Sequence, residues 1–178
     1  MSGPVLLTPR LALRPCTLAD VPALHALWQD PDVRRWLWDD VPIPEASARD
    51  VVQESLATFA ARGFGQWVAD ARGDGALRGF AGLRAFGDDG DVELLYGLLP
   101  AHWGEGLATE AARAVLDHGL RTLALPRVAA RADSPNAASV RVMRRLGLRF
   151  EGERQVQGRP TMHYAIAREE WLAARGGG

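Results

Sequence analysis

The chain has 178 residues, enough for one domain with a full hydrophobic core but short for two. Hydrophobic residues make up 47% and charged residues 24%, as in a soluble globular protein. The net charge of -1 gives no electrostatic reason to expect a nucleic-acid partner. A single cysteine, Cys16, excludes an internal disulfide and a multi-cysteine metal site.

No export or membrane signal is visible in the sequence. The first ten residues lack the basic start and the apolar stretch of a secretory signal peptide. No apolar run approaches the roughly 20 residues of a membrane span. We therefore expect a cytoplasmic protein with no membrane partner, folded as one domain over residues 1–178 with a frayed tail at 176–178.

The first third of the chain predicts one strand followed by helices. Apolar and polar residues alternate from Arg10 to Arg14, as in a strand. Thr17 can then cap a helix, and two prolines later break the chain. The pattern predicts helices after Thr17, over about 33–37 and over about 45–62.

The rest of the chain predicts hairpin-linked strands and then alternating elements. Strand signals cover 66–69, 77–86 and 92–99, and the short turns "ARGDGA" and "FGDDGD" between them favour antiparallel pairing. A helix over 104–120, a strand over 127–132, a helix over 135–146, strands over 149–155 and 161–167 and a short final helix follow. This order indicates an α/β (α+β) fold: one mixed sheet with helices on both faces.

Two glycines flank Glu105 where the helix over 104–120 is predicted to start. Glycine is unfavourable inside a helix, so the pair suggests that a ligand approaches the backbone closely. A helix N-terminus offers unpaired N–H groups and a positive dipole end, which attract phosphate. We interpret "HWGEGLAT" as a pyrophosphate cradle; a tight strand-to-helix turn without a ligand is the open alternative.

Three phosphate motifs compete for this stretch. A P-loop requires lysine, which the chain lacks. A dinucleotide fingerprint requires a third glycine, where the chain has Thr109, so a dinucleotide oxidoreductase is disfavoured. The third motif is the coenzyme A loop of the GNAT acyltransferases, Q/R-x-x-G-x-G/A. Residues 103–108 read W-G-E-G-L-A and match it except at Trp103.

The sequence resembles the GNAT branch that contains the ribosomal-protein N-terminal acetyltransferases (RimJ/RimL-like). The resemblance covers most of the chain, in the family's order. It is carried by "TPRLALRPCTLADVPALHALWQDPDVRRWL", "DVELLYGLLPAHWGEGLATEA", "NAASVRVMRRLGL" and "GRPTMHYAIAREEW".

The resemblance implies a single-domain GNAT fold and an acetyl-CoA-dependent N-acetyltransferase. The central sheet is then mixed and mostly antiparallel, and its fourth strand (92–99) and fifth strand (127–132) splay apart. The acceptor is a primary amine, on a protein N-terminus or a small molecule, which attacks directly in a ternary complex. A non-catalytic acyl-CoA sensor or interaction module on the same fold is the alternative. Relatives often form dimers, so a homodimer stays open.

The resemblance also implies which residues bind coenzyme A. Backbone groups near Tyr96 and Leu98 bond the pantetheine, and N–H groups of the glycine loop hold the pyrophosphate. Asn136 either contacts pantetheine or only satisfies a backbone group at a helix start capped by Ser134. The implied cofactor residues are Tyr96, Leu98, Trp103, Gly104, Glu105, Gly106, Leu107, Ala108, Thr109, Asn136 and Ser139.

Two residues are candidates for proton transfer. Glu93, where this branch often has a glutamate, is the predicted base for the amine, and an exposed strand carboxylate is the alternative. Met143 stands where many GNAT enzymes have a proton-donating tyrosine, and a thioether cannot donate. Ser139 is therefore the implied donor to the departing thiolate, or it only hydrogen-bonds coenzyme A.

The segment "RRWLWDD" is the candidate acceptor site. Trp36 and Trp38 can frame a peptide or a cation, and Asp39 can attract an ammonium group. The alternative is that the tryptophans pack the early helices and the aspartates are solvated. None of the four histidines has metal-ligand spacing, so we expect no metal.

Overall fold

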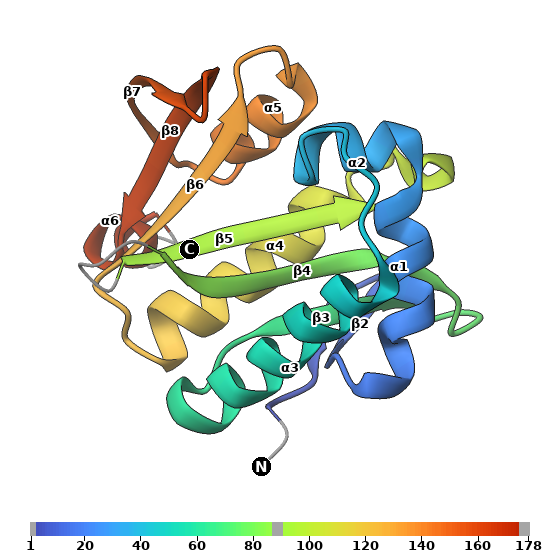
Figure 1. The fold of residues 1–178 in the computed structure, drawn as a ribbon. Helices are drawn as coiled ribbons and strands as arrows, with labels where there is room; N and C mark the ends of the chain where they lie inside the picture. The colour runs from blue at the N-terminus through green and yellow to red at the C-terminus, as the bar shows by residue number, and fades with distance from the viewer. Residues whose placement is uncertain (1–2, 87–90, 175–178) are drawn as a thin grey trace.

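The structure, a computed structural model, describes residues 3–86 and 91–174 and is built on one eight-stranded sheet (Figure 1). The strand order is β1-β2-β3-β4-β5-β6-β8-β7, and all neighbours are antiparallel except β5 and β6. The strands are β1 Leu6–Leu7, β2 Leu11–Pro15, β3 Gln66–Ala71, β4 Leu77–Phe86, β5 Asp91–Leu98, β6 Arg127–Asp133, β7 Arg149–Val156 and β8 Arg159–Ala167.

Helices cover both faces of the sheet, each over its own apolar core. One core packs α1, α2 and α3 against β3 and β4, and the other packs α4, α5 and α6 against the opposite side (Figure 1). The helices are α1 Val21–Gln29, α2 Pro31–Leu37, α3 Glu45–Arg62, α4 Leu107–Asp117, α5 Ala137–Arg145 and α6 Arg168–Ala173. Short 3-10 turns at Leu18–Asp20 and Pro100–His102 and a π turn at His118–Thr122 complete the elements.

The predicted α/β (α+β) class, with one mixed, mostly antiparallel sheet, is confirmed, and three details differ. β1 was not predicted, because two residues carry no periodic signal. The helix expected from residue 104 begins at Leu107, because Gly104 and Gly106 have positive φ angles of 82° and 81°, which no α-helix accommodates. Asn136, and not Ser134, caps α5. The predicted frayed tail lies outside the described residues.

The parallel strands β5 and β6 touch at one end and then separate. Their register contains one pair, Glu93 with Ala129, and Figure 1 shows β6 turning away from β5 beyond it. Past that pair, the described part of β6 offers no partner to the backbone of β5. The splay expected from the resemblance is thereby confirmed. It leaves alternate N–H and C=O groups of β5 facing a gap in the sheet.

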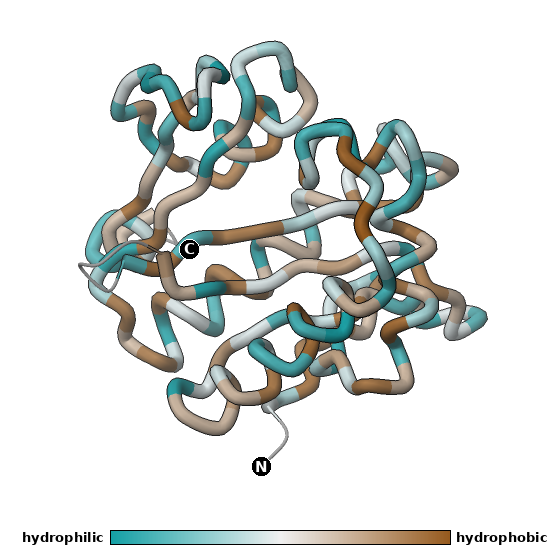
Figure 2. The backbone as a smooth tube through the Cα atoms, in the orientation of Figure 1, coloured by the Kyte–Doolittle hydropathy of each residue, from teal (hydrophilic) through white to brown (hydrophobic). Residues whose placement is uncertain are grey.

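The distribution of apolar residues follows this architecture. Figure 2 shows brown, apolar positions along the middle of β5 and teal, hydrophilic ones on the hairpin of β7 and β8. Cys16 is buried beside Ser55, and burial raises the pKa of its thiol. In the described ranges, none of the helices combines the length and apolarity needed to cross a bilayer.

The N-terminal segment is tied to the first turn of α4. The Glu110 carboxylate accepts hydrogen bonds from the Thr8 hydroxyl (2.6 Å), the Arg10 backbone N–H (2.8 Å) and the Arg10 Nε (2.7 Å). The same guanidinium donates to the Glu105 carbonyl at 2.9 Å. Burial acts to raise the pKa of Glu110, but the bonds from Thr8 and Arg10 outweigh it and lower that pKa. This contact fixes the loop before α4.

Glu110→Gln should lower the free energy of unfolding at neutral pH by about 1–2 kcal/mol, because it weakens charge-assisted bonds at a mostly buried site. Since the pKa of Glu110 is lower in the folded state than in the unfolded state, the ionised carboxylate contributes its whole share of the free energy of unfolding at pH values above the unfolded-state pKa. This share is lost as the pH falls through the folded pKa. Urea unfolding in progressively more acidic buffers should therefore show the two proteins converging. Glu45→Gln, at an exposed i,i+4 pair, is the control and should change little.

Candidate functional site

A cleft of about 400 Å³ lies where β5 and β6 separate, and we call it the β5–β6 cleft. Its walls come from α2, β5, β6, the loop before α4, the start of α4 and α5. It contains all the predicted cofactor residues except Glu105: Tyr96, Leu98, Trp103, Gly104, Gly106, Leu107, Ala108, Thr109, Asn136 and Ser139. The Glu105 side chain is half exposed, near His102, and its carbonyl is held by Arg10.

The glycine loop at the mouth of this cleft has the geometry of an anion cradle. A Cβ added at Gly104 would meet no heavy atom within 4 Å, so that side of the backbone is open. The first N–H groups of α4 follow directly, without intrahelical partners. The Thr109 hydroxyl is buried and has no hydrogen-bond partner among the described residues. Such an atom marks a place where a ligand or a water completes the hydrogen bonding.

Trp103 is turned toward the end of β5. Its indole Nε1 donates to the Leu98 carbonyl at 2.9 Å, and the side chain remains nearly half exposed. The residue therefore supplies no N–H donor to a phosphate, as expected for a tryptophan in the place of glutamine or arginine. It closes the loop onto β5, and it occupies one lone pair of the Leu98 carbonyl.

Tyr96 and Ser139 meet across the β5–β6 cleft. The Tyr96 hydroxyl lies 2.8 Å from the Ser139 hydroxyl, and the Ser139 backbone N–H donates to the Asn136 side-chain oxygen at 3.1 Å. Burial raises the pKa of Tyr96 to about 12, so the phenol keeps its proton at neutral pH. Met143 is fully buried in the core. The structure thus places the hydroxyl groups of Tyr96 and Ser139 in contact, whereas the sequence analysis named only Ser139 as a proton donor.

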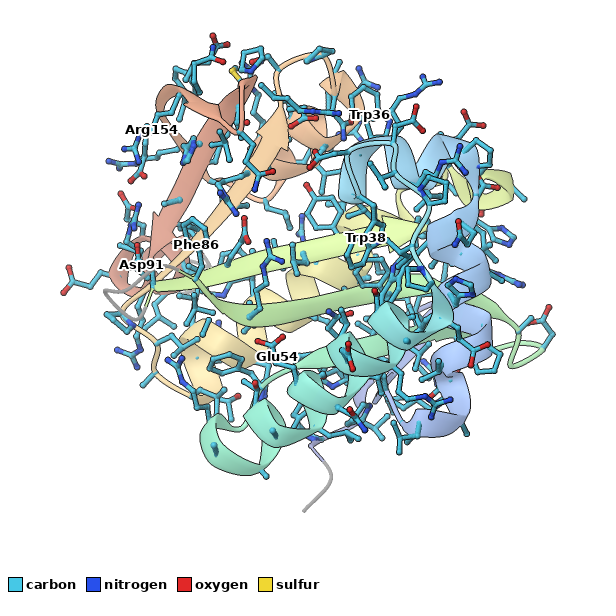
Figure 3. All side chains as sticks on the ribbon, viewed as in Figure 1. Trp36, Trp38, Glu54, Phe86, Asp91 and Arg154 are labelled. Carbon is cyan, nitrogen blue, oxygen red and sulfur yellow. The ribbon has the colours of Figure 1, made fainter. Side chains whose placement is uncertain are left out.

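A second cleft of about 540 Å³ lies on the face covered by α1–α3, and we call it the tryptophan cleft. The predicted Trp36, Trp38, Asp39 and Glu93 line it. Figure 3 shows Trp36 and Trp38 near the end of α2, with Phe86 at the far end of β4. The two clefts share five lining residues and therefore meet: Trp36, Leu37, Leu95, Arg131 and Ala132.

Glu93 lies between two arginines on the floor of the tryptophan cleft. One carboxylate oxygen accepts from Arg131 Nε at 2.6 Å, and the other from Arg84 NH2 at 2.7 Å and Nε at 2.8 Å. The side chain is only 3% exposed, so the alternative of an exposed strand carboxylate is wrong. Its role as a base stays a prediction. Protonation of the Glu93 carboxylate would break at least one of its ion pairs with Arg84 and Arg131.

The acceptor segment combines packing with exposure to the cleft. Trp38 packs edge-on against Trp28, with ring centroids 5.7 Å apart, as the packing alternative expected. Asp39 is ion-paired with Arg159 at 3.5 Å, so it is not simply solvated. Both residues nevertheless line the tryptophan cleft.

Sequence reasoning missed seven charged or polar residues of this cleft. The alternation in "RVAARAD" signals that Arg131 and Asp133 share a face of one strand, but it cannot say which strands lie beside them. The missed residues are Gln66, Arg84, Arg131, Asp133, Gln157, Arg159 and Thr161. Within the described ranges no group of three or more His, Cys, Asp or Glu is placed to hold a metal ion.

Comparison with known proteins agrees with this geometry. The model of the Acetyltransferase (GNAT) domain matches residues 10–149. The uncharacterized N-acetyltransferase p20 of Bacillus licheniformis is 29% identical over 83% of each chain. A GNAT-family acetyltransferase structure from Bacillus anthracis is 25% identical, with a TM-score of 0.80, over 94% of this chain and all of that one.

A more distant structure shares the fold. RimL, a ribosomal L7/L12 alpha-N-protein acetyltransferase solved in complex with coenzyme A, aligns with a TM-score of 0.79 at 20% identity. The alignment covers 92% of this chain and 98% of that one. The family match extends over most of the chain, including strands β5 and β6 and the glycine loop. The chain belongs to the GNAT family and is an acetyltransferase that uses acetyl-CoA.

Proposed function

We propose that the enzyme transfers the acetyl group of acetyl-CoA, bound in the β5–β6 cleft, directly to a primary amine bound in the tryptophan cleft. The observation that carries this proposal is the meeting of the two clefts at Leu95, Arg131 and Ala132. An amine in one cleft and a thioester in the other reach each other without a covalent enzyme intermediate. Holding both in place removes much of the entropic barrier to their encounter.

The pantetheine arm would lie along the edge of β5 that faces β6, where the backbone groups between Leu95 and Leu98 that do not pair with β4 have no strand partner. A backbone N–H of β5 beside the thioester carbonyl would stabilise the oxyanion of the tetrahedral intermediate. The pyrophosphate would rest on the N–H groups of residues 104–109 and on the Thr109 hydroxyl. Asn136, which caps α5 with its oxygen, would offer its NH2 group to the pantetheine.

The chemical step requires two proton transfers. The amine nitrogen forms a bond to the acetyl carbon, the carbon–sulfur bond breaks, the nitrogen loses a proton and the thiolate gains one. We assign the gain to Ser139, whose hydroxyl lines the β5–β6 cleft and can be resupplied by Tyr96 at 2.8 Å. Glu93 is the candidate base that takes the proton from the nitrogen. It lies two residues before Leu95 on the same face of β5, roughly 7 Å away along the strand, and can reach the amine through a water molecule.

Release of free thiol from acetyl-CoA, measured with a panel of amines and N-terminal peptides, tests the proposal. An acceptor that accelerates thiol release and yields the N-acetyl product supports it. Slow hydrolysis that no amine accelerates, despite tight acetyl-CoA binding, would contradict it and favour the non-catalytic acyl-CoA sensor.

Gly104→Ala should weaken acetyl-CoA binding about tenfold, because a methyl group would stand where the loop approaches the ligand and an L residue strains at φ 82°. Gly75→Ala is the matched control: Gly75 also has a positive φ, 68°, and open space around its Cβ, but lies in a turn between β3 and β4. Both variants should lose about 1–2 kcal/mol of stability. Calorimetry should show lower acetyl-CoA affinity for the first alone; equal affinities would count against the cradle.

Ser139→Ala should lower kcat about 100-fold with little change in the KM for acetyl-CoA, since general acid catalysis typically contributes that much. Tyr96→Phe should lower kcat less, and adding it to Ser139→Ala should cost little more, because the two hydroxyls act in series. Ser134→Ala, outside both clefts, is the control. A rise in the KM for acetyl-CoA at unchanged kcat would assign Ser139 to cofactor binding only.

Glu93→Gln should lower kcat by about 100-fold or more and leave acetyl-CoA affinity unchanged, because the amide keeps the shape of the side chain but cannot take the proton. Asp91→Asn, at the exposed start of the same strand, should keep kcat. Steady-state kinetics and calorimetry provide both measurements. An unchanged kcat would mean that Glu93 is not the base and that it only forms ion pairs with Arg84 and Arg131.

A further inference from the structure

Resting on the proposed function, we infer that the acceptor in the tryptophan cleft is a free amino acid, recognised by its carboxylate as well as its amine. The inference starts from an uneven distribution of charge within the cleft. Two arginines share one carboxylate on the floor, whereas two aspartates share one arginine at the rim. The cleft therefore has a positive and a negative region.

The positive region is formed by Arg84 of β4 and Arg131 of β6, on either side of Glu93. One buried carboxylate against two guanidinium groups leaves one formal positive charge in excess. Arg131 is held from a second direction by Phe86, whose ring centroid lies 3.8 Å from the guanidinium carbon. Glu93 and Phe86 thereby fix the orientation of the pair, as a preorganised anion site requires.

Both guanidinium groups keep donors for a ligand. Arg84 uses Nε and NH2 on Glu93, and so does Arg131, which leaves the NH1 group of each without a partner among the described residues. The Arg84 side chain is 50% exposed, and its partner Glu93 is buried beneath it. A planar carboxylate matches such free N–H groups, and charge-assisted bonds of this kind are strong.

The negative region lies further along β6. Arg159 contacts Asp39 at 3.5 Å and Asp133 at 3.4 Å, which leaves one formal negative charge in excess. All three residues line the tryptophan cleft. This region suits an ammonium group before it loses its proton.

The positive region reaches the junction with the β5–β6 cleft, because Arg131 lines both clefts, and the negative region lies next to it in the tryptophan cleft. Arg131 and Asp133 are two residues apart on the same face of β6, and Ala132 between them lines both clefts. A small acceptor with its carboxylate and its amine a few bonds apart can contact both regions while it lies at this junction. This is the arrangement of an α-amino acid.

Aromatic side chains form much of the remaining wall, which favours an acceptor with an apolar side chain. Trp28, Trp36, Trp38, Phe80 and Phe86 line the cleft. Its volume of about 540 Å³ lies in the range of small-molecule sites. A peptide with the same first residue presents an amide in place of the carboxylate and leaves the arginines without their anion.

The test compares the apolar protein amino acids, each as the free acid, the amide and an N-terminal tripeptide, in the thiol-release assay with the full chain. For the best accepted side chain, we expect kcat/KM for the free acid to exceed that of its amide and tripeptide about tenfold or more. Amides or peptides accepted as well as the acids would overturn the inference and leave the proposed function intact. Failure of every amine to accelerate thiol release would overturn both.

Variants of Arg84 connect that preference to the site. Arg84→Gln should reduce the ratio of acid to amide about tenfold, and Arg84→Lys, which keeps the charge but loses the fork, should restore part of it. Arg121→Gln, at an equally exposed arginine on the opposite side of the sheet, should leave the ratio unchanged. Thermal melting shows whether each variant is folded. An unchanged ratio in a folded Arg84→Gln protein would refute the carboxylate site.

Discussion

The parting of β5 and β6 after a single residue pair is the constraint on which the site depends. Two strands that paired along their full length would satisfy each other's backbone groups and leave no space for a ligand. Because they meet only at Glu93 and Ala129, the edge of β5 keeps free backbone groups inside the protein. Such groups cost free energy unless a ligand or water pairs with them. The β5–β6 cleft is thus a gap in the sheet whose free backbone groups a ligand of the right shape can pair with.

The same point of divergence carries a cluster of ion pairs. Glu93 binds Arg84 on β4 and Arg131 on β6, so three neighbouring strands are linked by side chains where two of them begin to separate. These residues also line the tryptophan cleft. The same ion pairs therefore link the strands and carry the charge of that cleft.

Local sequence signals predicted helix and strand boundaries well where a proline or a glycine marks them. The helix over 45–62 was predicted to its last residue, because Pro44 precedes it and Gly63 ends it in a left-handed conformation. The start of α4 was misplaced, because the positive φ angles of Gly104 and Gly106 delay the helix. Around the β5–β6 cleft, the predicted residues of one contiguous loop lie together because neighbours in sequence stay neighbours in space. Arg84, Arg131 and Arg159 were missed because they come from three separate strands.

The sequence by itself determined the order of elements, the glycine loop before a helix and the family resemblance, since each rests on short-range spacing. Only the tertiary structure decided that Glu93 is buried between arginines, that Tyr96 touches Ser139 and that two clefts share a wall. The reason is physical. Spacing along a strand fixes the face on which a side chain lies, but strand order and the angle between strands decide which side chains meet there.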